Sequence, residues 1–385
     1  MIKEITTERI PIKLWLNDLE EGALLQAKDL ANLNIACHHI AIMPDSHLGY
    51  GMPIGGVLAA KDAVVPNAVG VDIGCGMCSL RTSLTDINQK DLKRVMSEVR
   101  KLIPVGFKHN NEKQADKWMP ELTDELPIVI QEFESATFQV GTLGGGNHFI
   151  EIQRGSDGYI WIMIHSGSRN IGFTVAAHYH KLAIEETYER GIKDIPRDLS
   201  YFLSDSKNFD LYFKEMDYCM AFALNSRKLM MERVKESFVN IFPNVEFSNF
   251  INKPHNFAAY EAHFGEQLIV HRKGATRAEL GEWGMIPGSQ GSKSYLVIGK
   301  GNPESFNSCS HGAGRVMSRA KARKTLDLKA EMSRLQEMGV IHAVRNKSDL
   351  DEAPSSYKDI EQVMANQKDL VEIKIELTPM AVIKG

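Results

Sequence analysis

The 385-residue sequence has few cysteines, no long apolar run and no excess of positive charge. Its five cysteines are an odd number in a long chain, which argues against a disulfide framework and favours free thiols in a reducing compartment. The longest apolar run, Tyr159 to Ile164, is too short to span a bilayer, and the charged N-terminal stretch does not resemble a signal peptide. The net charge of -4 gives no overall basic footprint, so a nucleic-acid partner would have to bind local patches. We therefore expect a cytoplasmic protein without a membrane segment.

Neither an internal repeat nor a low-complexity linker divides the chain. Hydrophobic content of 43% and charged content of 24% are typical of a soluble globular protein. Polar loops punctuate predicted strands and helices along the whole length, which favours one large α+β domain over residues 1–385. We expect strands at residues 40–43, 56–60, 159–165, 295–298 and 371–377.

Three other segments carry structural predictions. Asp86 and Gln89 have the spacing of a capping box, with an apolar helix face following at Leu92, Val95, Met96 and Val99. Residues 105–140 are polar and contain prolines, so they are predicted to form an irregular surface insertion. Residues 175–250 are predicted to be a helical variable region.

Asp72 and Cys75 lie three residues apart between glycines, a spacing at which both side chains can bind one metal ion. Glycine allows the tight backbone conformations that a metal-binding loop needs. A hard carboxylate beside a soft thiolate suits a borderline divalent ion. Taken alone, the same pattern is also typical of a buried turn that holds an inert cysteine.

Three histidines in polar loops strengthen the metal interpretation. His148 follows three consecutive glycines, His165 ends a predicted strand, and His255 lies between proline and asparagine. Imidazole and thiolate are typical ligands of manganese, iron, cobalt or zinc. Cys78 could pair with Cys75, but no second closely spaced pair accompanies them, as a structural zinc site would require.

His311 has a different neighbourhood, since it precedes Gly312-Ala313-Gly314-Arg315 and a basic segment. We predict that it lies at the start of a helix, where backbone amides bind phosphate and small residues let the phosphate approach. An imidazole there could attack phosphorus, or it could simply cap the helix. Two basic clusters, residues 271–277 and 319–324, are predicted to contact RNA phosphates if the partner is RNA.

At this point the chain resembles the RtcB-type RNA ligases. The matching motifs run in family order over nearly the whole length: GVDIGCGM at 70–77, GGGNHFIE at 144–151, HSGSR at 165–169, PHN at 254–256, HRKGATR at 271–277, PGS at 287–289, SHGAGRVMSR at 310–319, YKDI at 357–360 and the terminal VIKG. The chain is somewhat short for the family, with the reduction between about residues 181 and 249, which bears on RNA selection rather than on catalysis.

The resemblance implies a single α+β domain with mixed sheets and peripheral helices around a central metal cleft. It implies an enzyme of RNA repair or tRNA splicing that joins an RNA 3'-phosphate, or a 2',3'-cyclic phosphate after its hydrolysis, to a 5'-hydroxyl. The cofactors would be two manganese ions with GTP as co-substrate. A monomer is implied, and an archease-like activating protein is a further partner to consider.

The resemblance also implies roles for individual residues. The metal ligands would be Asp72, Cys75, His148, His165 and His255, with Cys75 between the two ions. His311 would take GMP, and Arg169 would bind phosphate. The guanylate pocket would consist of Asn147, Phe149, Glu151, Ser289, Ser294, His311, Gly312, Ala313, Gly314, Arg315, Tyr357 and Lys384.

Two other functions remain open from the residues alone. A metal-dependent phosphodiesterase or phosphatase acting on RNA ends would use the same ligands but would need no guanylylated His311. A non-catalytic RNA-binding factor would need no such set of soft and borderline ligands.

Overall fold

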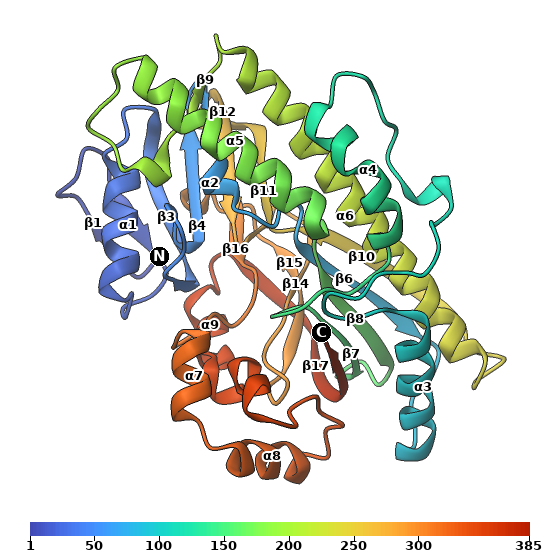
Figure 1. The fold of residues 1–385 in the computed structure, drawn as a ribbon. Coiled ribbons are helices and arrows are strands. Elements are labelled where there is room, and N and C mark those ends of the chain that lie inside the picture. The colour runs from blue at the N-terminus through green and yellow to red at the C-terminus, as the bar shows by residue number, and fades with distance from the viewer.

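The computed structural model describes all residues, 1–385, as one α+β unit built on two large sheets (Figure 1). The six-stranded sheet consists, in spatial order, of β1 (Lys3–Ile5), β2 (Ile12–Leu14), β3 (Ala36–His47), β4 (Ile54–Ala60), β12 (Glu266–Lys273) and β11 (Asn256–His263). The seven-stranded sheet consists of β10 (Phe247–Pro254), β6 (Gly76–Thr82), β8 (Ile160–Ser166), β7 (Phe149–Gly155), β17 (Val371–Lys384), β15 (Ser294–Gly299) and β14 (Trp283–Ile286). Two small sheets pair β13 (Ala275–Arg277) with β16 (Ser308–Ser310) and β5 (Ala63–Val64) with β9 (Phe202–Leu203).

The two large sheets differ in strand direction and meet at one turn. The six-stranded sheet is mixed, because β2 and β3 are parallel, whereas every pair in the seven-stranded sheet is antiparallel. β10 belongs to one sheet and β11 to the other, and only His255 separates them. The predicted α+β class with mixed sheets is confirmed.

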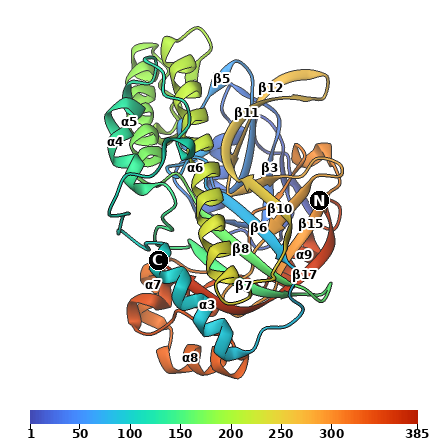
Figure 2. The same cartoon turned by 90° about the vertical axis from the view of Figure 1, so that its right-hand side faces the viewer.

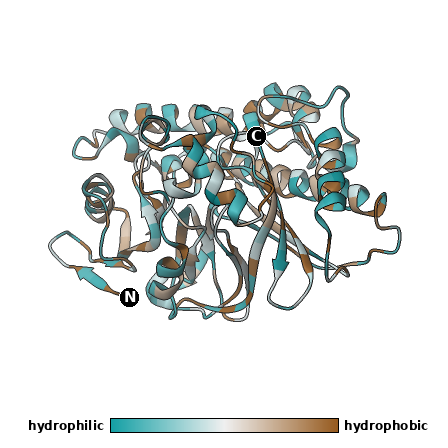
Figure 3. Cartoon of the chain, turned by 90° about the horizontal axis from the view of Figure 1, so that it is seen from below, coloured by the Kyte–Doolittle hydropathy of each residue, from teal (hydrophilic) through white to brown (hydrophobic).

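Helices lie at the periphery of the sheets (Figure 2). They are α1 (Glu21–Ala31), α2 (Pro66–Val69), α3 (Gln89–Leu102), α4 (Pro127–Gln139), α5 (Arg169–Glu189), α6 (Lys207–Val239), α7 (Arg319–Thr325), α8 (Leu328–Glu337) and α9 (Ile360–Asn366), with short 3-10 turns η1 (Asp116–Trp118), η2 (Arg197–Leu199), η3 (Pro303–Ser305), η4 (Lys347–Glu352) and η5 (Pro354–Ser356). The long helix α6 packs on β6, β8 and β10. Hydrophilic and hydrophobic residues are mixed along the peripheral helices, as expected for helices buried on one side (Figure 3).

The core beneath α3 and α6 follows the predicted periodicities. Ile162 and Ile164 of β8 are fully buried and cluster with Met230 and Val234 of α6. Burying each such side chain contributes about 1.5–3 kcal/mol. The predicted apolar face of α3 is confirmed, since Leu92, Val95, Met96 and Val99 are all buried.

The prediction of an irregular insertion at residues 105–140 was wrong for its second half, which forms helix α4. Pro127 stands in the first turn, where proline disrupts no helical hydrogen bond. The backbone N–H groups of Ile128 and Val129 donate to Glu215 of α6 at 2.7 and 2.8 Å, and both residues join the apolar core. Residues 105–126 are mostly irregular, as predicted.

Two other local predictions need correction. Asn88, not Asp86, caps α3, and its side chain accepts the N–H of Asp91 at 2.9 Å. The strand predicted at 40–43 extends from Ala36 to His47 and buries Asp45 completely. The helices predicted after residue 175 are present as α5 and α6, and the variability of that region stays a prediction.

All five cysteines are free thiols, in agreement with their number in the sequence. None of the helices combines the length and the apolar character needed to cross a membrane.

Candidate functional site

The predicted metal ligands meet at one edge of the seven-stranded sheet. Antiparallel neighbours place the start of one strand beside the end of the next, and the register pairs Gly76 with Ser166, Phe149 with His165, and Pro254 with Gly76. Cys75 and His148 directly precede β6 and β7, whereas His165 and His255 stand at the ends of β8 and β10. The sheet topology therefore brings together donors that are far apart in the sequence.

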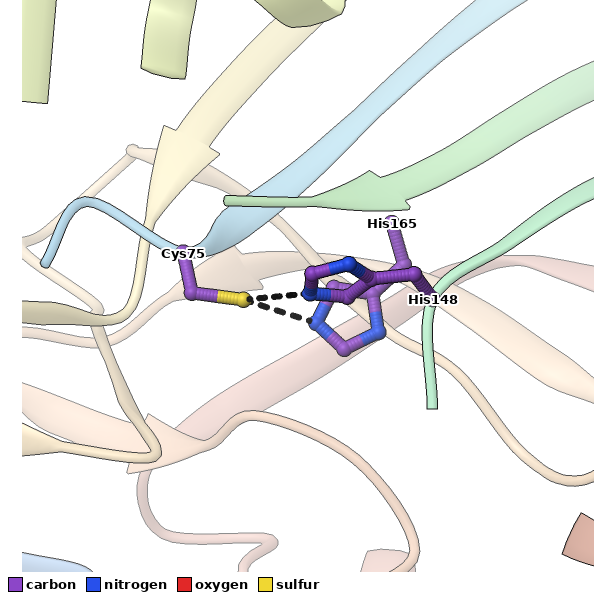
Figure 4. A group of neighbouring side chains, drawn as sticks. All are labelled: Cys75, His148 and His165. Carbon is purple, nitrogen blue, oxygen red and sulfur yellow. Dashed lines mark hydrogen bonds between the residues drawn. The ribbon is translucent and has the colours of Figure 1, made fainter. Parts of the chain in front are cut away.

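The donor atoms are close enough to share metal ions (Figure 4). Sγ of Cys75 lies 3.5 Å from Nε2 of His148 and 3.3 Å from Nε2 of His165. Nε2 of His165 lies 3.4 Å from Nε2 of His255, and Nε2 of His148 lies 3.1 Å from Oδ2 of Asp72. The thiol thus occupies the middle of the group, with the carboxylate and His255 toward its two ends.

The surroundings orient the imidazoles toward this centre. Nδ1 of His148 contacts the carbonyl oxygen of Leu143 at 3.1 Å, and Nδ1 of His165 contacts that of Asn147 at 3.2 Å. A proton on each Nδ1 leaves the Nε2 lone pair facing the thiol, the arrangement that second-shell carbonyls impose on metal-binding histidines. The residues therefore fit a divalent cation.

Burial sets the protonation of the group. It lowers the pKa of His165 and of His255 well below the ordinary value, so both imidazoles are neutral. Burial, followed by the nearby Asp72 charge, raises the pKa of the Cys75 thiol. For Asp72, burial alone would raise the pKa, but a protonated His148, which then donates from Nε2 and carries a charge, outweighs burial and lowers the pKa.

Gly167 and Arg227 support the metal-binding loop from behind. A Cβ on Gly167 would lie 2.1 Å from Oδ1 of Asp72, so only glycine fits there. Arg227 of α6 is fully buried, and its Nη1 donates to the carbonyl oxygens of Gly74 and Ser166 at 2.9 and 2.8 Å. Its guanidinium therefore holds the residues next to Cys75 and His165 in register.

Cys78 points away from the cluster of donor atoms, and its Sγ lies 3.9 Å from the carbonyl oxygen of Arg227.

His311 does not start a helix, contrary to the prediction. It follows β16, and α7 begins only at Arg319. The backbone N–H groups of His311 and Gly312 are not free helix-end donors. Both donate hydrogen bonds to Oδ2 of Asp45 in β3, at 3.1 and 3.2 Å. Nδ1 of His311 lies 2.7 Å from Oδ2 of Asp45, in a contact that is not aligned as a hydrogen bond.

The His311 ring packs edge-on against His255, with 4.8 Å between ring centroids, and lines the same cleft as the metal donors. No protein group bonds its Nε2 atom, which is therefore free for chemistry. Sequence analysis missed Asp45, although a Pro-Asp-Ser-His sequence after a buried strand was a visible signal.

The cleft has a volume of about 760 Å³. Nearly all residues predicted for the guanylate pocket line it, together with four of the metal donors: Asn147, Phe149, Glu151, Ser289, His311, Gly312, Ala313, Gly314, Arg315, Tyr357, Lys384, Asp72, Cys75, His165 and His255. Ser294 lies behind the wall, where its Oγ accepts from Gln153 and from the N–H of Gly288, both at 3.1 Å. Burial raises the pKa of Glu151 to about 8.

Glu352 is a central member of the cleft that sequence analysis did not identify. Its buried carboxylate accepts hydrogen bonds from Tyr357, from Lys384 at 2.9 Å and from Arg315 at 3.2 Å. Burial alone would raise its pKa, but the Lys384 charge and the other donors lower it to about 2. Three predicted pocket residues therefore share one carboxylate.

Arg169 lies beside the metal donors but outside the cleft lining. A Cβ on Gly144 would meet Nη1 of Arg169 at 2.2 Å and Nδ1 of His148 at 2.6 Å, so the guanidinium and this imidazole meet at the glycine loop. Nε of Arg169 donates to Thr142 and Nη2 to the carbonyl of Gly106, at 3.1 and 2.8 Å. Its φ of 60° is unusual for arginine and marks a backbone held by its surroundings.

The two predicted basic clusters differ in how far their side chains are buried. Arg272 and Lys273 of the first cluster, residues 271–277, are buried, whereas the Arg277 side chain is 41% exposed and lies 3.1 Å from Glu282, so contact of this cluster with RNA phosphates stays a prediction. Arg272 is fully buried against Glu261 at 2.6 Å, and Nζ of Lys273 donates to the carbonyls of Tyr50 and Asn67.

In the second cluster, residues 319–324, the basic side chains are exposed. Arg319 and Arg323 pair with carboxylates, at 3.2 Å from Glu352 and 2.6 Å from Asp351, whereas Lys321 and Lys324 form no ion pair.

Comparison with known proteins agrees with this architecture. The chain matches the family model described as "tRNA-splicing ligase RtcB" over residues 26–132 and 123–385. It is 39% identical to the RNA-splicing ligase RtcB of Escherichia coli K12 over 410 aligned positions, which cover 99% of each chain. It is 33% identical to the tRNA-splicing ligase RtcB of Nanoarchaeum equitans over 460 positions, which cover 98% of this chain and 95% of the relative. With the family model covering most of the chain and full-length relatives at this identity, the protein belongs to the RtcB family.

Proposed function

We propose that the protein is an RNA ligase of RNA repair or tRNA splicing that uses GTP to join 3'-phosphate ends, or 2',3'-cyclic phosphate ends after water has opened the ring to a 3'-phosphate, to 5'-hydroxyl ends. One observation carries the proposal. A histidine with a free Nε2, whose backbone N–H donates to the buried carboxylate of Asp45, faces the same cleft as a cluster of metal donors, 4.8 Å from the His255 ring. The names of the relatives support the ligase class.

In this proposal Asp72, Cys75, His148, His165 and His255 would hold two manganese ions. The central position of Cys75, within 3.5 Å of both His148 and His165, supports a shared thiolate ligand. Bound cations would neutralise the phosphate charges that meet in the cleft. The mixed donors suit a divalent transition-metal ion in general, and the choice of manganese rests on the family resemblance.

His311 is the proposed nucleophile toward GTP. Its Nε2 attacks the α-phosphorus, the N–P bond forms, and the bond to the bridging oxygen of pyrophosphate breaks. Asp45 lies beside Nδ1, where it stabilises the positive charge that the ring gains. An oxygen of the RNA 3'-phosphate then attacks the same phosphorus and displaces the histidine, which gives RNA activated by GMP.

The last step joins the two RNA ends. The 5'-hydroxyl attacks the RNA phosphorus, the new phosphodiester forms, and GMP leaves with the electrons of the broken P–O bond. Arg169 is proposed to hold an RNA phosphate with its unpartnered Nη1, beside His148. The remaining pocket residues would bind the guanylate, with Glu151 and Lys384 facing the base and the backbone of residues 312–315 facing the phosphates.

Two expectations rest on the family resemblance alone. We expect the protein to act as a monomer and to respond to an archease-like activating protein.

Incubation with α-labelled GTP and manganese, followed by denaturing electrophoresis, tests the proposal. Wild type and a His178→Ala control, altered at a half-buried histidine of α5, should gain an acid-labile label, and His311→Ala should gain none. A phosphodiesterase would open a cyclic phosphate at the RNA end, and a phosphatase would release phosphate from it, in both cases without labelling, whereas a binding factor would do none of these. Retention of the label by His311→Ala would disprove the assignment of the nucleophile.

A further inference from the structure

The loop that follows α3 presents three consecutive exposed side chains, Phe107, Lys108 and His109. Phe107 is 100% exposed, more than any other large apolar side chain of the protein. A solvated ring next to two groups that carry or can gain positive charge differs from an isolated surface hydrophobe. It combines a stacking surface with cations.

The backbone beneath these side chains is held in place. The N–H of Gly106 donates to Gly144 at 2.9 Å, and that of Lys108 donates to Val105 at 3.2 Å. On the far side, Nδ2 of Asn110 donates to the carbonyls of Phe138 and Val140, at 2.8 and 2.9 Å. The exposed ring therefore stands on an ordered backbone, so a ligand that covers it need not order the loop first.

The same loop touches the metal-binding edge of the sheet. The carbonyl of Gly106 accepts from Arg169, whose guanidinium meets His148 at Gly144. A Cβ on the terminal residue, Gly385, would lie 2.9 Å from the N atom of Gly106. In Figures 1 and 2 the loop accordingly passes beside the C-terminus, next to the ends of β7 and β17.

Single-stranded nucleic acid is bound by aromatic rings that stack on bases and by cations that follow the backbone. We propose that residues 107–109 form a subsite for unpaired RNA next to the end being joined, in which Phe107 stacks on a base and Lys108 contacts the adjoining phosphate. The subsite rests on the proposed function, and Arg169 connects it to the reacting end. A protein partner is less well matched, because the exposed residues that follow Phe107 along the loop, Lys108 and His109, are polar rather than apolar.

RNA affinity tests the stacking contact. Binding of a short single-stranded RNA with a 3'-phosphate is measured by fluorescence anisotropy for wild type, Phe107→Ala, Phe107→Leu and Phe107→Trp. Tyr188→Ala removes a ring that is 77% exposed at the other end of α5 and serves as the control. Loss of one base stack should weaken binding about tenfold in the alanine and leucine variants. Tryptophan and the control should bind as wild type does.

Two further measurements separate stacking from charge. RNAs with one abasic nucleotide at successive positions from the 3'-end should reveal one position at which Phe107→Ala causes no further loss. Lys108→Ala should flatten the log–log salt dependence of affinity by about 0.7, whereas Phe107→Ala should leave this slope unchanged. Unchanged RNA affinity in Phe107→Ala, or full affinity in Phe107→Leu, would overturn the proposal and leave the ring to a protein partner.

GTP labelling of the wild type, in which no RNA takes part, reports on the proposed function separately. If the wild type took no label while Phe107 variants still lost RNA affinity, the ligase mechanism would fall and the RNA subsite would stand.

Discussion

The ammonium group of Lys384 lies 2.9 Å from Oε2 of Glu352, inside the cleft that also holds His311. Lys384 is held there because β17 pairs with β7 up to the pair Lys384–Phe149. The residue is therefore ordered and only 12% exposed at its side chain, not the frayed lysine that its position near the chain end would suggest. Its neighbour Glu352 connects it to Tyr357 and Arg315, so these groups form one charged network around the proposed guanylate pocket.

Lys384→Ala should weaken GTP use and reduce the preference for GTP over ATP. A lysine near the base can donate to guanine O6 or N7, whereas adenine has an amino donor in place of O6. Losing a hydrogen bond from a charged donor costs about 1.5–3 kcal/mol, or roughly tenfold to a hundredfold in GTP affinity. Labelling of His311 with both nucleotides over a range of manganese concentrations measures this. Lys374→Ala, which removes an exposed lysine of the same strand, is the control. An unchanged GTP preference in Lys384→Ala would rule out the contact.

Asp45→Asn should slow the labelling of His311 while leaving the affinity for GTP nearly unchanged. Asparagine keeps the size of the side chain but removes the negative charge beside Nδ1, so the imidazolium is less stabilised. We expect a rate loss of roughly tenfold to a hundredfold, the cost of one charge-assisted contact. Single-turnover labelling and GTP titration separate the two effects. Asp62→Asn, at an exposed position whose φ of 52° asparagine tolerates, should behave as wild type. Equal losses in rate and affinity would make Asp45 a purely structural residue.

Cys75→Ala should lose bound manganese, because a thiolate shared by two ions would be missing from both. Cys78→Ala is a matched control, since this cysteine is also buried but its sulfur faces Arg227. Elemental analysis after dialysis counts the ions per chain. A full manganese content in Cys75→Ala would show that the cysteine is only a buried turn residue.

Arg227→Met should lower the affinity for manganese. The substitution keeps much of the apolar stem but leaves the carbonyls of Gly74 and Ser166 without their donor, so the loops holding Cys75 and His165 loosen. The loss of buried hydrogen bonds will also lower stability, so the readout is the rise in melting temperature on adding manganese. Arg233→Met, on the same helix but bonded to Gly141, is the control. A manganese-induced rise equal to that of the control would limit Arg227 to a structural role.

Binding of guanosine should strengthen as the pH rises toward about 8. Burial raises the pKa of Glu151 to about 8, so the free protein holds this group protonated at neutral pH. The ionised carboxylate accepts two hydrogen bonds and suits the N–H groups of guanine, whereas the protonated acid must donate one. Affinity should therefore increase almost tenfold per pH unit below about 8 and level off above it, and Glu151→Gln should remove this dependence. Calorimetry with guanosine, which carries no phosphate, keeps metal binding out of the measurement.

The folding stability of the protein should change with pH in the opposite direction to its guanosine affinity. Because the folded pKa of Glu151 exceeds the value of 4.5 for an ordinary glutamate, the folded chain holds more protons, and its stability falls as the pH rises from about 4.5 to 8. Glu151→Gln should show less of this decline in chemical denaturation.

Much of the site was predictable because its chemistry is local. Glycines flank Asp72 and Cys75, histidines lie at the ends of predicted strands, and the residue types alone predict a set of metal ligands, whose side chains the structure brings together. The period of two in β17 and the apolar face of α3 likewise follow from side-chain geometry, which repeats with each strand residue or helical turn.

Other features depend on contacts between distant segments. Whether Arg272 faces solvent is decided by the strands on either side of β12, and Glu261 on one of them makes burial of the guanidinium possible. Asp45 replaces the helix end expected at His311 because β3 brings its carboxylate beside residues 311 and 312. Glu352 gave no signal in the sequence, since a glutamate in a short acidic stretch is ordinarily a surface residue.

The sequence by itself determined the donor types, the glycine loops and most strands and helices, since these follow from each residue and its near neighbours. Only the tertiary structure decided that Cys75 stands between His148 and His165, that Asp45 holds His311, and that Glu352 joins Lys384 to Arg315. The physical reason is that antiparallel pairing sets which strand ends meet, and pairing depends on the packing of all strands and helices together.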